Sequence, residues 1–262
     1  MSLGGINESF KPGDAIFFSG APWYGSAPQC DSYEKAVVGR KNQNKMTDTE
    51  WQNFKQAIKD LKAAPESDSS PNFQQIVQCH IDAMRTPAGQ KWGAHGGINF
   101  LTWHRAYLQH FEARLRSFNS AVFLPYWDWI VDRAIPKQLG KTSEWGVTRR
   151  SNPNFSGVAK TKDLENLLKK TTFIEFSEAV ENAPFHNSVH GVVGGDMVSA
   201  ASPSDPLFWL HHCFIDKLFA NWQRMHGNIK HPNMGEVLLP PPIITKTNGQ
   251  VWSFLNLGYN YI

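Results

Sequence analysis

The chain has 262 residues, of which 41% are hydrophobic and 13% aromatic, and its formal net charge is +3. A chain of this length can bury one sizeable core, so we expect a single domain over 1–262. We expect its first 37 residues to be rich in loops, and we expect no C-terminal domain that shields the rest. The lysines and arginines are scattered rather than gathered in a stripe, which argues against nucleic acid or anionic lipid as a partner.

The cellular setting is indicated by what the sequence lacks. The first residues, MSLGGINESF, have no basic and apolar signal pattern, and no later stretch is long and apolar enough to cross a bilayer. We therefore expect a soluble chain with no membrane partner, either cytoplasmic or exported together with a partner. Its three cysteines, Cys30, Cys79 and Cys213, are an odd number without metal-ligand spacing, which favours a reducing compartment slightly.

The first clear element is a helix that begins after residue 47. Thr47 and Glu50 have the spacing of a capping box, and Pro65 ends the run. Between them, apolar residues recur at helical spacing: Trp51, Phe54, Ile58 and Leu61. This pattern predicts an amphipathic helix that buries one face.

Two further helices place histidines on their apolar stripes. In the helix predicted near 72–85, His80 lies on the buried face, and in the helix near 98–118, His104 does. His95 falls in the loop between them, at 87–97. His110 lies off the apolar stripe, so we expect it to be solvated.

The second half of the chain begins with an aromatic segment, FLPYWDWI, which is interrupted by Pro125 and is expected to be an extended or turn segment packed against the helices. A helix from about Asp163 leads to a second capping box at Thr172 and Glu175, and a helix near 184–196 follows. Asp205 and Pro206 form a helix start, and the very apolar helix that they open is expected over 206–225.

Six of the ten histidines form two clusters that predict two metal half-sites. The clusters are His80, His95 and His104, and His186, His190 and His212. Three neutral imidazoles each, without cysteine or carboxylate at ligand spacing, suit copper, zinc or iron. His186 and His190 are four residues apart, which puts both on one side of a helix. Spacing alone leaves His211 and His212 as alternatives, since both have apolar neighbours.

The surrounding motifs carry a specific resemblance. They are RKNQNKMTDTEW, LTWHRAYL, LPYWDW, HNSVHGVVGGDM, SPSDPLFWLHHCFIDKLF and the terminal GYNY. Over roughly residues 38 to 262 the chain resembles the tyrosinase family of type 3 copper proteins, which includes catechol oxidases, o-aminophenol oxidases and molluscan haemocyanin units. With the predicted helices, this indicates a mainly α fold with few short strands, in which helices near 72–85, 98–118, 184–196 and 206–225 form a central four-helix bundle.

The resemblance also implies the cofactors and their ligands. The first cluster would bind one copper, CuA, and the second the other, CuB, with O2 as co-substrate and small phenols as substrates. The family's spacing selects His212 as the third CuB ligand and leaves His211 as a supporting residue. A structural dizinc protein is the alternative that the histidines alone leave open.

Further roles are implied around the ligands. In the family, a glutamate and an asparagine beside the first CuB histidine hold a water that takes the phenol proton; Glu181 and Asn187 match them, and Glu178 competes with Glu181. Gly191 and Ala200 stand at the substrate pocket, where their small size predicts an open entrance.

At other positions the sequence either matches the family or departs from it. Ala94, Gly93 and Met84 stand where a cysteine thioether to His95 would be sought, so we predict none; Cys79 has the wrong offset. Asp216 could orient an imidazole or pair with a basic side chain. Arg40 and Tyr259 are expected to tie the start of the domain to its end.

These expectations favour a tyrosinase, which hydroxylates monophenols and oxidises o-diphenols to o-quinones. The alternatives are a catechol oxidase or o-aminophenol oxidase without monophenolase activity and, less favoured because no appended domain covers the entrance, an oxygen carrier resembling haemocyanin. A chaperone that loads the copper is a further partner, and the sequence leaves open whether the chain needs one.

Overall fold

The computed structural model describes residues 38–84, 94–238, 240 and 244–262, so the predicted loop-rich segment 1–37 lies outside the described residues. Within the described ranges the helices of eight or more residues are α1 (Asp48–Ala63), α2 (Phe73–Met84), α3 (Phe100–Phe118), α5 (Thr161–Leu168), α6 (Phe173–Glu181), α7 (His186–Val193) and α8 (Pro206–Met225). The shorter elements are α4 (Thr142–Trp145), α9 (Asn248–Trp252), β1 (Val38–Arg40) and β2 (Tyr259–Tyr261). The prediction of a mainly α fold with few short strands is confirmed.

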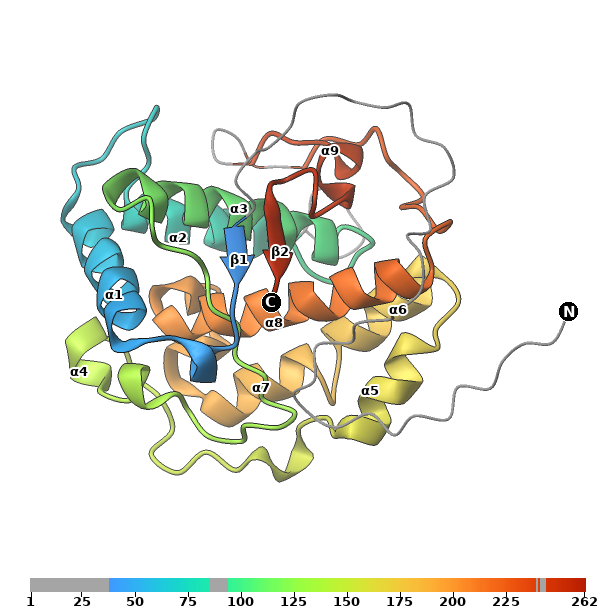
Figure 1. Cartoon of the computed structure of the whole chain (residues 1–262), viewed down its shortest axis with the longest axis horizontal. Helices are drawn as coiled ribbons and strands as arrows, with labels where there is room; N and C mark the ends of the chain where they lie inside the picture. The colour runs from blue at the N-terminus through green and yellow to red at the C-terminus, as the bar shows by residue number, and fades with distance from the viewer. Residues whose placement is uncertain (1–37, 85–93, 239, 241–243) are drawn as a thin grey trace, which may run out of the picture.

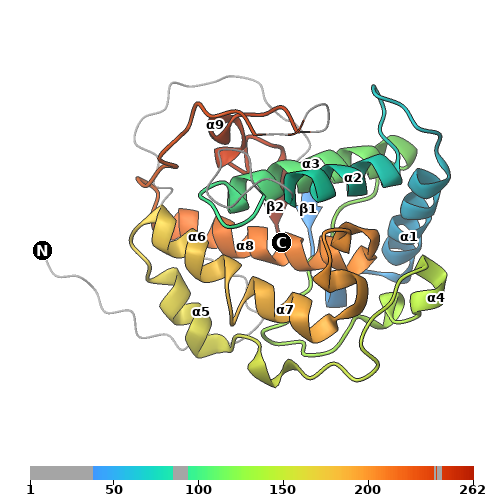
Figure 2. The same cartoon turned by 180° about the vertical axis from the view of Figure 1, so that it is seen from behind.

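The bundle is formed by α2, α3, α7 and α8, as predicted. α2 and α3 lie side by side over α8, and α7 lies along the other side of α8 (Figures 1 and 2). Phe111 in α3 stacks on Trp209 in α8 with ring centroids 3.5 Å apart, and the Tyr107 hydroxyl of α3 donates to the Ile76 carbonyl of α2 at 2.7 Å. These contacts bring the histidine-bearing faces of the helices together.

Helix starts agree with the capping signals. Thr47 and Glu50 form the reciprocal capping box of α1, and the Asp205 carboxylate accepts from the Leu207 N–H at the start of α8 at 2.8 Å. Thr172 accepts from the N–H of Glu175 at 3.2 Å, whose carboxylate in turn accepts from the Thr172 hydroxyl. The caps at Thr47 and Asp205 form as predicted. At Thr172 the hydroxyl caps the helix, but the Glu175 carboxylate contacts that hydroxyl rather than the Thr172 N–H, so the predicted capping box is only partly formed.

The predicted helix near 184–196 is shorter at both ends than expected. α7 begins at His186 and ends at Val193, because Gly194 and Gly195 have φ of 68° and 58°. An added Cβ at Gly195 would come 2.1 Å from the carbonyl oxygen of Thr148, so this turn requires glycine. The chain therefore turns sharply directly after Val193, three residues beyond His190.

A buried charge network ties the two ends of the described chain together, as expected for Arg40 and Tyr259. β1 and β2 pair in parallel, and the fully buried Arg40 donates to Glu112 at 2.8 Å, with its guanidinium 3.6 Å from the centroid of the Tyr259 ring. Asp216 accepts from Arg105 at 2.6 Å and from the Tyr259 hydroxyl at 2.5 Å. Of the two roles considered for Asp216, the structure supports pairing with basic side chains.

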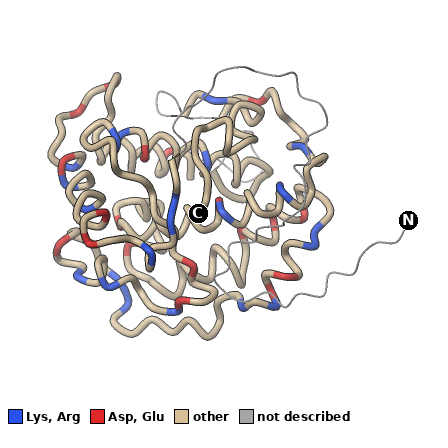
Figure 3. Tube along the Cα trace, in the orientation of Figure 1, with Lys and Arg blue, Asp and Glu red and all other residues tan. Residues whose placement is uncertain are grey.

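The remaining sequence expectations concern extended segments and surface. FLPYWDWI runs without helix up to Asp128 and turns at Trp129 and Ile130, and its Tyr126 forms a parallel bridge with Asn42. Figure 3 shows basic and acidic residues scattered along the described trace rather than gathered on one face. None of the helices in the described ranges has the length and apolar character that a membrane crossing requires.

The expectation that His110 is solvated is wrong. The side chain is half-buried, and burial lowers its pKa to about 4, with Arg114 and Lys246 adding to the shift. Lys246 belongs to the C-terminal segment, whose α9 packs on α3. The apolar stripe of a single helix does not reveal which distant segments pack near its other residues.

This burial makes folding stability depend on pH, and His110→Gln should reduce that dependence by the share of His110. Between pH 6.5 and 4 the unfolded chain binds a proton at His110 that the folded chain does not, so the folded state loses stability as pH falls through this window. At about 1.36 kcal/mol per pKa unit, the share of His110 is about 2 to 3 kcal/mol near pH 4.5. Urea unfolding of the wild type and of His110→Gln at pH 7 and pH 4.5 measures this difference. An equal loss of unfolding free energy in the two proteins would contradict the prediction.

Candidate metal centre

The first histidine cluster joins two helices and a loop. His80 on α2 and His104 on α3 are buried, and His95 in the preceding loop is partly buried. One ring nitrogen from each of the three lies within 4.8 Å of the others. The ring centroids of His95 and His104 are 4.9 Å apart, and those of His80 and His104 are 5.8 Å apart. Residues that span 24 positions of the sequence, from His80 to His104, thus converge on one point.

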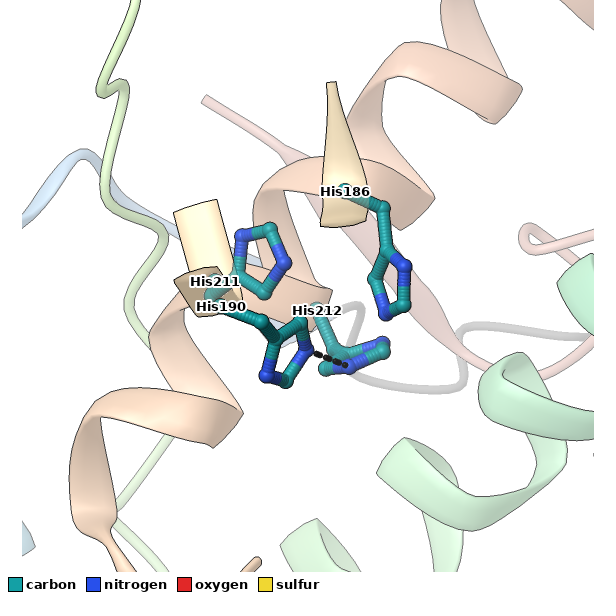
Figure 4. Close-up of side chains that lie close together, drawn as sticks. All are labelled: His186, His190, His211 and His212. Atoms are coloured by element: carbon teal, nitrogen blue, oxygen red, sulfur yellow. Dashed lines mark hydrogen bonds between the residues drawn. The ribbon is translucent and has the colours of Figure 1, made fainter. Parts of the chain in front are cut away.

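The second cluster is formed where α7 crosses α8. His186 and His190 from α7 meet His211 and His212 from α8, and one ring nitrogen from each lies within 4.8 Å of the others (Figure 4). The Nε2 atoms of His190 and His212 are 3.3 Å apart. This is close to the ~3.3 Å expected for two imidazole nitrogens each about 2.0 Å from one tetrahedral ion.

The two clusters are in direct contact. The rings of His104 and His212 stack with centroids 4.2 Å apart and an interplanar angle of 11°, and the rings of His95 and His186 are 5.3 Å apart. Phe208 lies against both sides, 5.3 Å from His80 and 4.1 Å from His212. The arrangement is one paired centre with apolar walls.

Most of these imidazoles are oriented through Nδ1 by an oxygen acceptor. Backbone carbonyls of other residues accept from His80, His104 and His190. Glu181 is the acceptor for two more histidines: its backbone carbonyl for His186 and its carboxylate for His95. The pairs are His80 with Ala200 O at 2.7 Å, His104 with Phe100 O at 2.9 Å, His190 with Met197 O at 2.5 Å, His186 with Glu181 O at 3.1 Å and His95 with Glu181 Oε1 at 3.3 Å. An Nδ1 that donates leaves Nε2 with its lone pair.

The ring nitrogens left without hydrogen-bond partners include those that a metal would use. The Nε2 atoms of His80, His95, His104, His186 and His211 are buried with no hydrogen-bond partner, and so is the Nδ1 atom of His212. Burial lowers the pKa of His80 to about 3 and that of His190 to about 4, so both rings are neutral at pH 7. Neutral imidazoles with free lone pairs are ligands that copper accepts readily, so the residues present fit the metal that the resemblance implied.

Glu181 is buried, whereas Glu178 is exposed, so only Glu181 lies at the centre. Its Oε1 accepts from the Gly96 N–H at 2.7 Å and lies 3.3 Å from His95 Nδ1. Asn187 is exposed, with its Oδ1 3.0 Å from His186 Nδ1. Glu181 and Asn187 therefore both contact ligand-type histidines, one in each cluster.

The two predicted pocket residues differ in their surroundings. Gly191 is exposed, and a Cβ added to it would meet no atom within 4 Å. Ala200 is partly buried, and its carbonyl is the acceptor for His80. Sequence reasoning missed Arg150, whose Nη2 lies 3.5 Å from the Gly191 carbonyl oxygen, because the two are brought together only by the turn at Gly194 and Gly195.

The thioether prediction stays untested at Gly93, which lies outside the described residues. Ala94 is fully buried. Cys79 is a buried free thiol whose pKa is raised to about 12, first by burial and then by Asp82. A thiol that remains protonated is a poor nucleophile, which agrees with an unmodified cysteine.

The comparisons with known proteins point the same way. The family model "Common central domain of tyrosinase" matches residues 70–172 and 141–225. The chain is 32% identical to a tyrosinase from Streptomyces glaucescens over 234 residues, covering 71% of this chain and 83% of that protein. It is also 29% identical to a haemocyanin from Enteroctopus dofleini over 223 residues, covering 71% of this chain and 8% of that protein.

Solved structures show the same fold. A functional unit of octopus haemocyanin superposes with a TM-score of 0.68 at 24% identity, covering 86% of this chain and 68% of that chain. A polyphenol oxidase from Vitis vinifera superposes with a TM-score of 0.66 at 17% identity, covering 93% of this chain and 90% of that chain. Together with the sequence matches, these findings show that the chain belongs to the tyrosinase family, whose members bind two copper ions.

Proposed function

We propose that this chain is a copper-dependent tyrosinase that hydroxylates monophenols at the ortho position and oxidises o-diphenols to o-quinones. His80, His95 and His104 would hold one copper, and His186, His190 and His212 the other. When bound, the two ions supply the electrons that reduce O2 and the oxidising power that acts on the phenol. The observation that carries the proposal is the set of buried, unpartnered Nε2 atoms in two contacting clusters.

The protein's own contribution to monophenol oxidation is the handling of a proton. A phenol has a pKa near 10 and is mostly protonated at neutral pH, so a base must remove its proton. Glu181 is the buried carboxylate at the centre, and its backbone carbonyl and the Asn187 Oδ1 both approach His186 Nδ1, at 3.1 and 3.0 Å. We assign the base role to Glu181, acting through a water, with Asn187 helping to place that water.

One observation favours a second candidate, a diphenol or o-aminophenol oxidase. The Glu181 Oε1 atom already accepts from the Gly96 N–H at 2.7 Å and faces His95. A carboxylate engaged in this way could position a ligand loop without accepting protons. Oxidation of an o-diphenol then continues, and hydroxylation of a monophenol does not.

Glu181→Gln distinguishes the two roles. Glutamine retains an oxygen that can accept from Gly96 and His95, but it cannot serve as a base. We expect monophenol oxidation to fall on the order of 10²- to 10⁴-fold, the usual contribution of a general base, while diphenol oxidation changes far less. Initial rates on a monophenol and on its catechol, with copper content measured in the same samples, give the result.

The matched control is Glu178→Gln, an exposed carboxylate on the same helix, which should leave both activities unchanged. Equal losses of both activities in Glu181→Gln, at full copper content, would remove the base assignment and favour a positioning role.

The function as a whole is tested by three substrates on the copper-loaded wild-type protein: a monophenol, its catechol and an o-aminophenol. Turnover of the monophenol supports the proposal. Turnover of only the other two indicates the second candidate. Reversible O2 binding without turnover of any substrate would indicate an oxygen carrier and overturn the proposal.

A further inference from the structure

Trp129 and His211 form a buried hydrogen bond beside the second cluster. Trp129 lies at the turn that ends the FLPYWDWI segment after α3, and His211 precedes His212 in α8. Both side chains are fully buried. The Trp129 indole Nε1 donates to His211 Nδ1 at 3.0 Å. The Trp103 ring packs against His80 and His104, but among the described residues only His211 of the two clusters accepts a hydrogen bond from an indole.

This bond determines which nitrogen of His211 carries the proton. The indole N–H is only a donor, so His211 Nδ1 must present its lone pair, and a neutral ring then carries its proton on Nε2. The rings of His80, His104 and His190 are the reverse case, because their Nδ1 atoms face carbonyl oxygens, which are only acceptors. A protonated nitrogen has no lone pair to offer a metal.

Distance alone does not keep His211 away from a metal ion. A ring nitrogen of His211 lies within 4.8 Å of one in each of His186, His190 and His212, and its ring stacks on that of His186 with centroids 5.3 Å apart (Figure 4). The geometry alone would therefore permit four imidazoles around one ion. Catalytic metal sites keep a coordination position open for substrate.

We propose that Trp129 is a positioning residue that holds His211 as the Nε2–H tautomer and so limits the second copper to three imidazole ligands. The inference rests on the proposed copper site, but the tautomer is a property of the metal-free protein. Without the indole N–H, the His211 proton is free to move to Nδ1, and Nε2 becomes a fourth ligand that closes the open position.

The test is Trp129→Phe, which keeps an aromatic ring and removes the donor. The ring nitrogens of metal-free protein labelled with ¹⁵N-histidine report each tautomer by NMR. We expect Nε2–H at His211 in the wild type, in contrast to Nδ1–H at His80, His104 and His190, and loss of that fixed tautomer in the variant. A wild-type His211 protonated on Nδ1, or a variant with an unchanged tautomer, would overturn the proposal.

The matched control is Trp127→Phe. Trp127 is equally buried in the same segment, but its indole donates to the Asp132 carbonyl at 2.9 Å, so its removal should destabilise the fold without changing His211. X-ray absorption of the Cu(I) protein is a second readout: mean imidazole coordination per copper should rise in Trp129→Phe and not in Trp127→Phe. If monophenol turnover fails while the wild-type tautomers are as stated, the proposed function fails and the Trp129 assignment stands.

Discussion

His212→Gln is expected to reduce bound copper from two ions per chain to one and to abolish oxidation of both monophenols and diphenols. His212 is buried between the clusters, with its Nε2 3.3 Å from that of His190 and its ring stacked on His104. Glutamine removes the imidazole ligand, and a single remaining copper ion could not supply the two electrons needed to reduce O2. His211 cannot substitute while its Nε2 carries a proton. Metal analysis and oxygen consumption on the same preparation measure both effects.

The control is His226→Gln, at the C-terminal end of the same helix. His226 caps α8 and its Nε2 contacts the Leu168 carbonyl at 2.9 Å, away from both clusters. It should retain two copper ions and full activity. A His212→Gln protein that keeps two ions, or a His226→Gln protein that loses one, would show that the ligand assignment is wrong.

Asp216→Asn is expected to destabilise the folded protein by about 3 to 5 kcal/mol, the cost of leaving a buried charge without its partner. Asp216 is buried and accepts from Arg105, Arg40, Tyr259 and Tyr261. Although burial alone would raise its pKa, the pKa lies below the usual value because of Arg105 and Arg40. This loss is a large part of a typical domain's stability, so the melting temperature should fall steeply.

The control is Glu165→Gln, which breaks the exposed pair with Lys162 at 3.1 Å. Exposed pairs contribute less than about 1 kcal/mol, so the melting temperature should barely change. Calorimetry of the metal-free proteins separates this effect from copper binding. Similar small losses in both variants would mean that the network around Asp216 does not stabilise the pairing of β1 with β2.

Local signals in the sequence predicted most of the helices. The caps at Thr47 and Asp205 involve residues at most three apart, so they are visible without the fold. The spacing of His186 and His190 is equally local. Inward placement of His80 and His104 followed from helical periodicity, because a residue on an apolar stripe is buried by whatever packs there.

What could not be predicted depends on contacts between distant segments. The early end of α7 results from the close approach of Thr148 to Gly195, and the lowered pKa of His110 reflects burial together with Arg114 and the distant Lys246. The contact of Glu181 with Gly96 joins residues 85 positions apart. The tautomer of His211 depends on Trp129, 82 positions away, and neither residue alone signals that bond.

The carbonyl acceptors of the ligand histidines have a consequence for how such an enzyme can vary. The oxygens that orient His80, His104 and His190 belong to the main chain at positions 200, 100 and 197, and they are present whichever side chains stand there. Substitutions that reshape the walls of the centre at these positions therefore leave the donor set of the metals in place. Side chains at these positions can therefore change during evolution and alter substrate preference, while the histidine nitrogens available to the metals stay the same.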